Sequence, residues 1–371
     1  MLPRLAARSP VRSLARAYVT QPKGRPEVLA KRPDDVVITF AKRTALGRAK
    51  KGQLKDIPVD ELLHALFKAT FEKIKLNPAL LEDICSIVHI SNAIRGGQIE
   101  LGMAVGVESM SLNPRPTPEV VPTISENGQA HDCVQPMGWT SEMVARAYNV
   151  SRQKQDEYAL ISHTRASKAV SEGTFKDEIL PVELRGAVVS VDDTVRPGVT
   201  HESLAKLKPV FLEDGASTAG NSSGVGDGAA LCILTSRARA EKEGWDVVGK
   251  YVASAFVGVE PRYMGISPAA AIPKVLAQTG LSKEDIDVWE INEAFASQFA
   301  YCVEQLQIPI EKINPNGGSI ALTHPLGMTG TRQVVTGLAE LRRRNAPLLC
   351  TSMCIGSGMG GAAIFVNEAR H

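Results

Sequence analysis

The sequence of 371 residues has almost no excess charge and few cysteines, and each shortage excludes a class of protein. Lysine and arginine number 42 and aspartate and glutamate 40, which leaves a formal charge of +2. A nucleic-acid-binding domain would normally be basic, so no nucleic-acid partner is expected. The six cysteines are too few for a disulfide framework, and none forms a CxxC pair, so no structural metal site is expected. An apolar content of 44% excludes a disordered chain.

The sequence also lacks a run that is typical of a membrane helix. The uncharged run 345–367 is long enough to cross a bilayer, but four glycines and several polar residues interrupt it. A glycine-rich loop that enters a buried strand fits this composition better. We therefore expect no membrane-spanning segment.

No acidic residue precedes Glu27, and the first 20 residues are rich in arginine. A spacing of four places these arginines near one face of a helix, as in a mitochondrial transit peptide. A disordered basic tail is the alternative, because Pro10 interrupts a single helix. The sequence thus predicts a targeting segment and linker over 1–34, and the mitochondrial matrix as the location. The arginines concerned are Arg4, Arg8, Arg12 and Arg16.

Short apolar runs alternate with amphipathic segments along the chain. Residues 35–40 and 103–108 are candidate strands, and 59–74 repeat leucine and phenylalanine with helical spacing. The alternation restarts near Gly249, which predicts an α/β fold with a largely parallel sheet. Two similar glycine-rich turns, which begin at Gly224 and Gly356, suggest two related halves.

Three segments in the last third of the chain carry candidate catalytic residues. His324 lies in a glycine-rich loop, where it could donate a hydrogen bond or shuttle a proton beside bare backbone amides. Cys354 opens a glycine turn whose dipoles would stabilise the thiolate. Asn292 stands where a strand runs into a helix, and it could orient a water or a carbonyl. Taken singly, each residue has a structural alternative: a packed histidine, a buried thiol and a helix cap.

Together, these segments resemble the thiolase family. The chain has Asn-Glu-Ala-Phe at 292–295, Gly-Gly-x-Ile-Ala-x-x-His-Pro-x-Gly at 317–327 and Cys-Ile-Gly-x-Gly-Met-Gly at 354–360, in the family's order. The likeness extends over about residues 35–366 and is closest to the 3-ketoacyl-CoA thiolases of peroxisomal type. Other segments that resemble family motifs are 137–142, 151–156 and 218–230.

The resemblance implies an acyl transfer in two steps. Thiolases cleave a 3-ketoacyl-CoA with free coenzyme A through an acyl-cysteine, and they release acetyl-CoA and a shortened acyl-CoA. By position, His324 would activate the nucleophile and help form an oxyanion hole, and Asn292 would hold the water of that hole. Cys354 would move the proton of the acetyl α-carbon, and the amide of Gly356 would donate to a second oxyanion hole. Coenzyme A is a substrate here, so no cofactor is implied.

The resemblance also implies an architecture. Two similar halves of βαβ type, 35–240 and 245–371, would stack their sheets around shared buried helices, with a loop domain at about 112–215 inserted in the first half. Thiolases are dimers or tetramers, so a homodimer or homotetramer that binds acyl-CoA and coenzyme A is expected. The peroxisome is the alternative location, although residues 368–371 do not resemble a peroxisomal SKL-type signal.

The motif that carries the family's nucleophile, of the type Asn-Arg-Gln-Cys-Ser-Ser-Gly, is absent. Residues 82–85 resemble the family's second strand, and 86–97 resemble the second half of the nucleophile's helix. A few dozen residues are therefore predicted to be missing between them, through a skipped exon, a gene-model error or a real deletion. Cys85 precedes a helix that would lower its pKa, but flank matching places it in a strand, where its geometry is poor for substitution.

Two consequences follow from this missing motif. The N-terminal half would be incomplete, and the chain would be impaired as an acyltransferase. The alternative is a non-catalytic protein of the same fold that binds coenzyme A or partners another subunit.

Three further positions follow from the resemblance. Ser254 lies near the family's pantetheine contact. His163 is a candidate contact to the nucleotide part of coenzyme A, with a solvated helix residue as its alternative. Thr323 replaces the usual glycine before the histidine, so its side chain is expected to crowd the pocket or to restrict the turn.

Overall fold

The computed structural model describes residues 23–114, 121, 123 and 128–369. Within these residues, nine strands form one mixed sheet in the order β3-β4-β7-β1-β8-β11-β10-β9, with the short β2 beside β7, and β5 and β6 form a separate hairpin. The bounds are β1 Val36–Arg43, β2 Gly47–Arg48, β3 Asp83–Cys85, β4 Leu101–Ser109, β5 Val182–Leu184, β6 Ala187–Val189, β7 Gly226–Ser236, β8 Gly249–Gly258, β9 Val288–Ile291, β10 Leu348–Ile355 and β11 Met359–Asn367.

The expectation of a largely parallel sheet is wrong. Among the strands of the nine-stranded sheet, the pairs β3–β4 and β9–β10 are parallel, and the other pairs are antiparallel. A tight turn between Ile355 and Met359 returns the chain from β10 to β11 without a crossover helix, and this forces the two strands to be antiparallel. The alternation of strands and helices could not reveal this hairpin, because its glycines belong to a turn rather than to a crossover.

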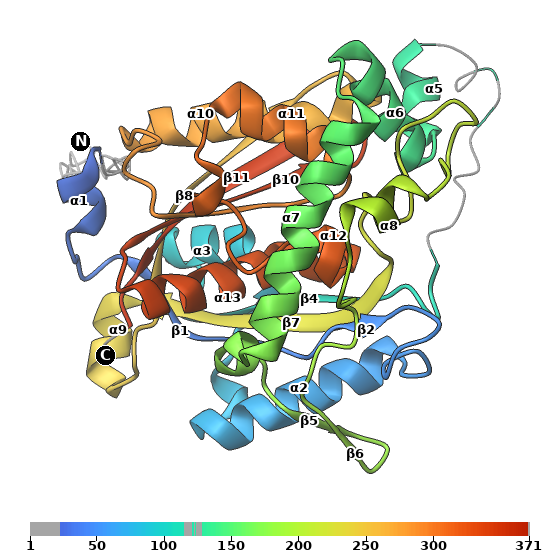
Figure 1. The fold of residues 1–371 in the computed structure, drawn as a ribbon. Helices are drawn as coiled ribbons and strands as arrows, with labels where there is room; N and C mark the ends of the chain where they lie inside the picture. The colour runs from blue at the N-terminus through green and yellow to red at the C-terminus, as the bar shows by residue number, and fades with distance from the viewer. Residues whose placement is uncertain (1–22, 115–120, 122, 124–127, 370–371) are drawn as a thin grey trace, which may run out of the picture.

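The sheet consists of two stacked halves that meet at one end. Three residue pairs, at Val36–Ile38, join β1 to β8. Figure 1 shows α3, α12 and α13 between the halves, α2 outside one half, and α10 and α11 outside the other. The predicted α/β class, with two similar halves around shared buried helices, is thus confirmed. The bounds are α2 Val59–Ile74, α3 Ile87–Arg95, α10 Ser267–Thr279, α11 Ala296–Leu306, α12 Ser319–Leu322 and α13 Leu326–Arg344.

The two halves repeat one topology. In chain order, β1, β3, β4 and β7 take the places in the first half that β8, β9, β10 and β11 take in the second. In both halves the fourth strand lies antiparallel to the first and third, and the third lies parallel to the second. The two similar glycine-rich turns lead into the two fourth strands, β7 and β11, which accounts for their likeness in sequence.

Helix α13 is the element that both halves share. It begins after Pro325 and ends at Asn345, which adopts the left-handed conformation with φ 51°. Three arginines in its last turn oppose the negative end of the helix dipole. Gly337 lets the helix approach β10 closely, because a Cβ at this position would lie 2.5 Å from the side chain of Leu349.

The middle region packs beside the sheet. Figure 1 shows α7, Arg152–Ser171, crossing both halves. Residues 1–22 of the predicted targeting segment and linker, and residues 115–120, 122 and 124–127 of the predicted loop domain, lie outside the described residues. The predicted domain boundaries stay predictions. The other α-helices of the described residues are α1 Arg25–Leu29, α5 Gly128–Val134, α6 Met137–Ala147, α8 His201–Ala205 and α9 Arg237–Glu243. In the described part of the chain, no helix is long and apolar enough to cross a membrane.

A buried ion network ties the middle region to β1. Arg43 is fully buried and donates to Glu178 at 2.6 Å and to the two carboxylate oxygens of Asp192 at 2.7 and 2.9 Å. Burial alone would lower the pKa of Arg43, but the carboxylates of Asp192 and Glu178 raise it. The network therefore holds a charged guanidinium in the interior, and it depends on all three groups.

Replacement of Arg43 by alanine should lower the free energy of unfolding by about 3–5 kcal/mol, because two buried carboxylates lose their cation. Urea denaturation followed by circular dichroism measures this loss. Arg185→Ala is the control, because Arg185 forms an exposed pair with Glu61 and its loss should change the midpoint little. Equal losses in the two variants would contradict a structural role for the buried network.

Candidate active site

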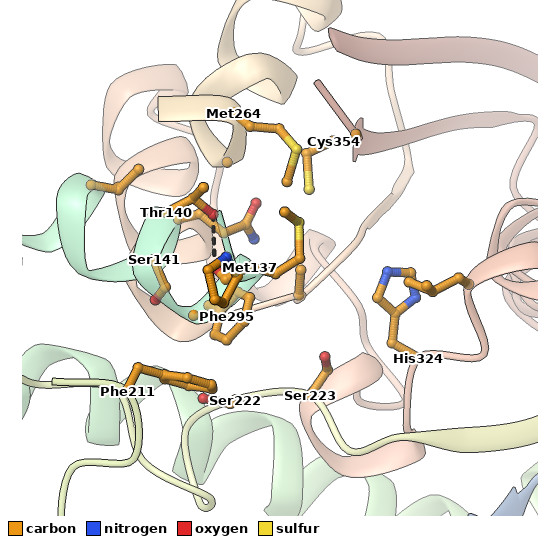
Figure 2. A pocket seen from close by; sticks show the side chains of 18 of the residues that line it. Met137, Thr140, Ser141, Phe211, Ser222, Ser223, Met264, Phe295, His324 and Cys354 are labelled. Atoms are coloured by element: carbon orange, nitrogen blue, oxygen red, sulfur yellow. Dashed lines mark hydrogen bonds between the residues drawn. The ribbon is translucent and has the colours of Figure 1, made fainter. Parts of the chain in front are cut away.

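A cavity of about 660 Å³ contains three of the predicted residues in its wall: His324, Cys354 and Gly356. Figure 2 shows His324 and Cys354 on this cavity, with Ser222 and Ser223 at its lower side. Most of the remaining wall is apolar, and its bulkiest side chains are Met110, Met137, Phe211, Met264, Phe295 and Met353. The cavity therefore combines a few polar groups with a surface suited to an apolar ligand.

The imidazole of His324 is fixed on both sides. Its Nδ1 lies 2.7 Å from Thr329 Oγ1 and its Nε2 lies 3.2 Å from Asn292 Nδ2. The backbone N–H of His324 donates to the carbonyl of Gly224 at 2.8 Å. This hydrogen bond joins the loop of His324 to the glycine-rich turn that precedes β7 in the first half. Burial, with a smaller effect of the Arg332 charge, lowers the pKa of His324 to about 4. The ring is therefore neutral at physiological pH.

Asn292 follows the end of β9 and points its amide at His324. Its backbone N–H donates to the carbonyl of Ser352 at 2.9 Å, and its Oδ1 accepts from Ser319 Oγ at 2.6 Å. The alternative of a helix cap is wrong, because α11 begins at Ala296 and Phe295 occupies the cap position. Asn292 thus belongs to the surroundings of the histidine.

Cys354 lies near the end of β10 and is buried. The prediction that the glycine turn would stabilise its thiolate is wrong: burial raises the pKa of the Cys354 thiol to about 11. The cost of removing a charge from water exceeds the effect of the turn dipoles here. Gly356, in the turn that follows, has open space around it, since a Cβ there would meet no atom within 4 Å.

The other predicted residues lie elsewhere. Cys85 is exposed on β3, the outer strand of the first half, and is not among the residues that line the cavity. Ser254 lies on β8, and its hydroxyl is 2.8 Å from Tyr251 Oη. His163 is buried in α7 with Nε2 3.0 Å from the carbonyl of Gly220, so the alternative of a solvated helix residue is wrong. Neither Ser254 nor His163 lines the cavity, and their predicted contacts with coenzyme A stay predictions.

Some groups around the site could not be found from the sequence alone. The methionines and phenylalanines of the wall come from separate segments and share no spacing. Ser319 and Thr329 lie inside the glycine-rich loop and α13, but nothing in their pattern marks them as partners of Asn292 and His324. Among the described residues, no cluster of histidine, cysteine, aspartate and glutamate could hold a metal ion.

Comparison with known proteins decides the family. The chain matches the family description "Thiolase, N-terminal domain" over residues 84–238 and "Thiolase, C-terminal domain" over 245–367. The chain belongs to the thiolase family. It is thus a thiolase-family acyltransferase, and the resemblance found in the sequence is confirmed at this level.

Several relatives are similar over most of their length. The chain is 46% identical to the peroxisomal 3-ketoacyl-CoA thiolase B of Rattus norvegicus, covering 89% of this chain and 90% of the relative. The human peroxisomal 3-ketoacyl-CoA thiolase is 44% identical with the same coverage. The crystal structure of the dimeric peroxisomal thiolase of Saccharomyces cerevisiae has a TM-score of 0.89 at 40% identity, covering 93% of this chain and 100% of that one. Human mitochondrial 3-ketoacyl-CoA thiolase in complex with CoA has a TM-score of 0.83 at 32% identity, covering 90% and 98%.

Thr323 adopts an unusual backbone conformation in the turn before the histidine and is not among the residues that line the cavity, so of the two expected effects the structure favours the restricted turn. It has φ 75° and ψ 168°, a conformation that a β-branched residue rarely adopts. Its hydroxyl is buried and has no hydrogen-bond partner, and a Cβ on Gly226 would lie 2.2 Å from it. The backbone at position 323 is therefore strained, and the threonine side chain fits only because Gly226, which lies against it, has no side chain.

Thr323→Gly should raise the free energy of unfolding by about 1 kcal/mol, because relief of backbone strain and loss of an unpaired hydroxyl outweigh the extra freedom of glycine in the unfolded chain. Thr70→Gly is a matched control, because Thr70 also buries an unpaired hydroxyl but lies inside α2. That control should be destabilised by about 1 kcal/mol or more. Thermal unfolding measures both, and destabilisation of Thr323→Gly would show that the turn is not strained.

The raised pKa of Cys354 predicts slow alkylation. At pH 7.5 a thiol of pKa about 11 has a thiolate fraction of the order of 10²-fold below that of an ordinary cysteine, and burial slows the reaction further. Iodoacetamide followed by peptide mass spectrometry should therefore modify exposed Cys85 long before Cys354. Labelling of Cys354 should rise with pH up to about 11. Labelling of Cys354 as fast as Cys85 at pH 7.5 would contradict the neutral thiol.

Proposed function

We propose that this site is built for the thiolytic cleavage of 3-ketoacyl-CoA in fatty-acid β-oxidation, and that the chain as it stands lacks the cysteine that accepts the acyl group. The relatives named as 3-ketoacyl-CoA thiolases support the reaction. The structural observation that supports it most is the contact of His324 with Asn292 beside a cavity that Cys354 and Gly356 also line.

The protonation states of the site fit such a reaction. A neutral imidazole can take the proton of an attacking thiol. A neutral thiol at position 354 can give its proton to the acetyl α-carbon when the carbon–carbon bond breaks, and it can recover a proton from the thiol of incoming coenzyme A. The amide of Gly356 can donate to an oxygen that becomes negative, and Asn292 can hold the water that donates to the other such oxygen. The step that this chain cannot supply by itself is the covalent capture of the acyl group.

The repeated topology supports a missing segment in the first half. In the second half, residues 292–325 separate β9 from α13, and they contain α11, a bridge of Ile313 to the edge of β9, and α12. In the first half, Ser86 alone separates β3 from the corresponding α3. Helix α3 has 9 residues against 19 in α13. The equivalent of the segment that delivers His324 to the cavity is thus the part that the first half lacks.

The comparisons with relatives also support a missing segment at this place in the first half. The match to the N-terminal thiolase domain begins at residue 84, next to the predicted junction between Cys85 and Ser86, although β1 of the same half lies far upstream. The alignment with the rat relative extends over 383 positions but uses 89% of the 371 residues here. Dozens of its positions therefore have no residue of this chain opposite them.

Cys85 is a poor substitute for the missing nucleophile. It lies on the exposed outer edge of β3 and does not line the cavity that holds His324 and Cys354. An acyl group on Cys85 would therefore lie outside the reach of the groups that stabilise charge, and even about 1 Å of misplacement can cost on the order of 10²-fold in rate.

We also propose the peroxisome as location and a homodimer as assembly. Three of the four similar proteins named above are peroxisomal and the fourth, at lower identity, is mitochondrial, which favours this alternative over the mitochondrial matrix that the N-terminus predicts. One similar structure is described as a dimeric peroxisomal thiolase, which favours a dimer over a tetramer.

Thiolysis of acetoacetyl-CoA by the purified chain tests the proposal. The unmodified chain should show no turnover above background. A chimera that inserts the corresponding segment of the rat relative between Cys85 and Ser86 should gain turnover, and the same insert with its cysteine replaced by serine should lose it. Near-normal turnover of the unmodified chain, abolished by Cys85→Ala, would contradict the proposal.

The alternative of a non-catalytic binding protein is tested on the same sample. Isothermal titration with coenzyme A should show binding without turnover if the chain is a binding or partner subunit. The titration separates this alternative from a chain that has lost its ligand site altogether, for which no heat of binding is expected.

A further inference from the structure

A continuous series of hydrogen bonds runs behind the cavity. Arg332 Nη2 lies 3.5 Å from Ser319 Oγ, which lies 2.6 Å from Asn292 Oδ1. Asn292 Nδ2 lies 3.2 Å from His324 Nε2, and His324 Nδ1 lies 2.7 Å from Thr329 Oγ1. Thr329 Oγ1 then donates to the backbone carbonyl of Pro325 at 2.8 Å. All the side chains in the series are buried.

The two ends of this series fix its direction. A guanidinium can only donate, so Arg332 must donate to Ser319, and the hydroxyl proton of Ser319 is left for Asn292. A carbonyl oxygen can only accept, so the hydroxyl of Thr329 donates its one proton to the carbonyl of Pro325. The same hydroxyl must therefore accept from Nδ1–H of His324. Every hydrogen bond between these ends then points the same way, with Asn292 donating to His324.

We infer that Ser319 is a positioning residue: its hydroxyl holds the amide of Asn292 with Nδ2 toward His324, and this keeps His324 in the tautomer with hydrogen on Nδ1 and the lone pair on Nε2. A flipped amide would present Oδ1 to His324 and would favour a proton on Nε2 instead. The lone pair on Nε2 is the basic site of the ring, so the tautomer decides whether the imidazole can take a proton there.

The surroundings of Ser319 hold its hydroxyl in a fixed position. Ser319 is the first residue of α12 and is fully buried. Arg332 is itself anchored by Glu290, whose Oε2 lies 2.9 Å from Nη1 in a buried ion pair. The positive charge of Arg332 also opposes protonation of His324, in the same direction as burial. Orientation and charge thus both favour a neutral ring whose Nε2 lone pair accepts from Asn292 and carries no proton.

This inference gives a structural reason for the base assigned in the proposed function, and only its catalytic meaning rests on that function. The tautomer itself is a property of the chain without substrate. It can therefore be wrong while thiolysis is right, and it can be right in a chain that has no turnover.

Long-range nitrogen–proton NMR spectra of the full chain, labelled in histidine, measure the tautomer directly. The chain has seven histidines, and the signals that vanish in His324→Gln identify His324. Wild type should show His324 neutral at pH 6.5 with hydrogen on Nδ1. In Ser319→Ala the ratio of Nε2–H to Nδ1–H should rise about fivefold, as expected for the loss of about 1 kcal/mol of net hydrogen bonding.

Three comparisons make the test specific. Ser319→Thr retains a hydroxyl and should restore the wild-type tautomer. Thr329→Val removes the acceptor at the other end and should shift the ratio in the same direction as Ser319→Ala. Ser267→Ala is the matched control, because Ser267 is a buried serine whose hydroxyl donates to the carbonyl of Met359, outside the series. It should leave the ratio unchanged.

The inference is overturned if Ser319→Ala keeps the wild-type ratio, or if Ser267→Ala shifts it as much. If Ser319→Ala does not fold, Ser319→Cys and Thr329→Val decide. A ratio that stays at the wild-type value in both of these variants overturns the inference, and a shift toward Nε2–H in both supports it.

Discussion

The burial of α13 between two half-sheets is the constraint on which the rest of the structure depends. Each half presents an apolar inner face, and neither can cover that face alone. The shared helix satisfies both, which explains why it is buried on most sides and why Gly337 must lie against Leu349. The loop that leads into this helix is thereby held rigidly, and it is the loop that carries His324.

Desolvation then sets the chemistry of the cavity. The same burial lowers the pKa of the imidazole and raises that of the thiol, so both groups are neutral and can exchange protons without first losing a counter-ion. Hydrogen bonds of Asn292 and Thr329 with the ring of His324 then decide which of its nitrogens carries the proton. The chemistry of the site thus depends on the buried side chains behind the cavity wall as much as on the groups that line the cavity.

The sequence predicted the elements whose chemistry is local. His324, Asn292 and Cys354 lie in compact motifs, and the structure places their segments around one cavity region. The predicted direction of the strands is wrong because direction depends on which strands become neighbours in the sheet. The alternation of strands and helices along the sequence does not determine those neighbours. The prediction of a thiolate at Cys354 is wrong because the glycine turn can be recognised in the sequence, whereas the burial of the thiol depends on the fold. The apolar wall was missed because its residues come from distant segments.

The outer edge of β3 has a consequence for handling the protein. In the described chain β3 pairs with β4 and leaves its other edge open, and Ile84 on this strand is 51% exposed. An open edge with an apolar side chain is a template for aggregation. Glu82 and Asp83 place carboxylates beside it, and Arg239 at 3.7 Å and His89 at 2.9 Å offset part of the repulsion between two copies that approach edge to edge. Salt screens that repulsion, and concentrated samples should therefore precipitate more readily at high ionic strength.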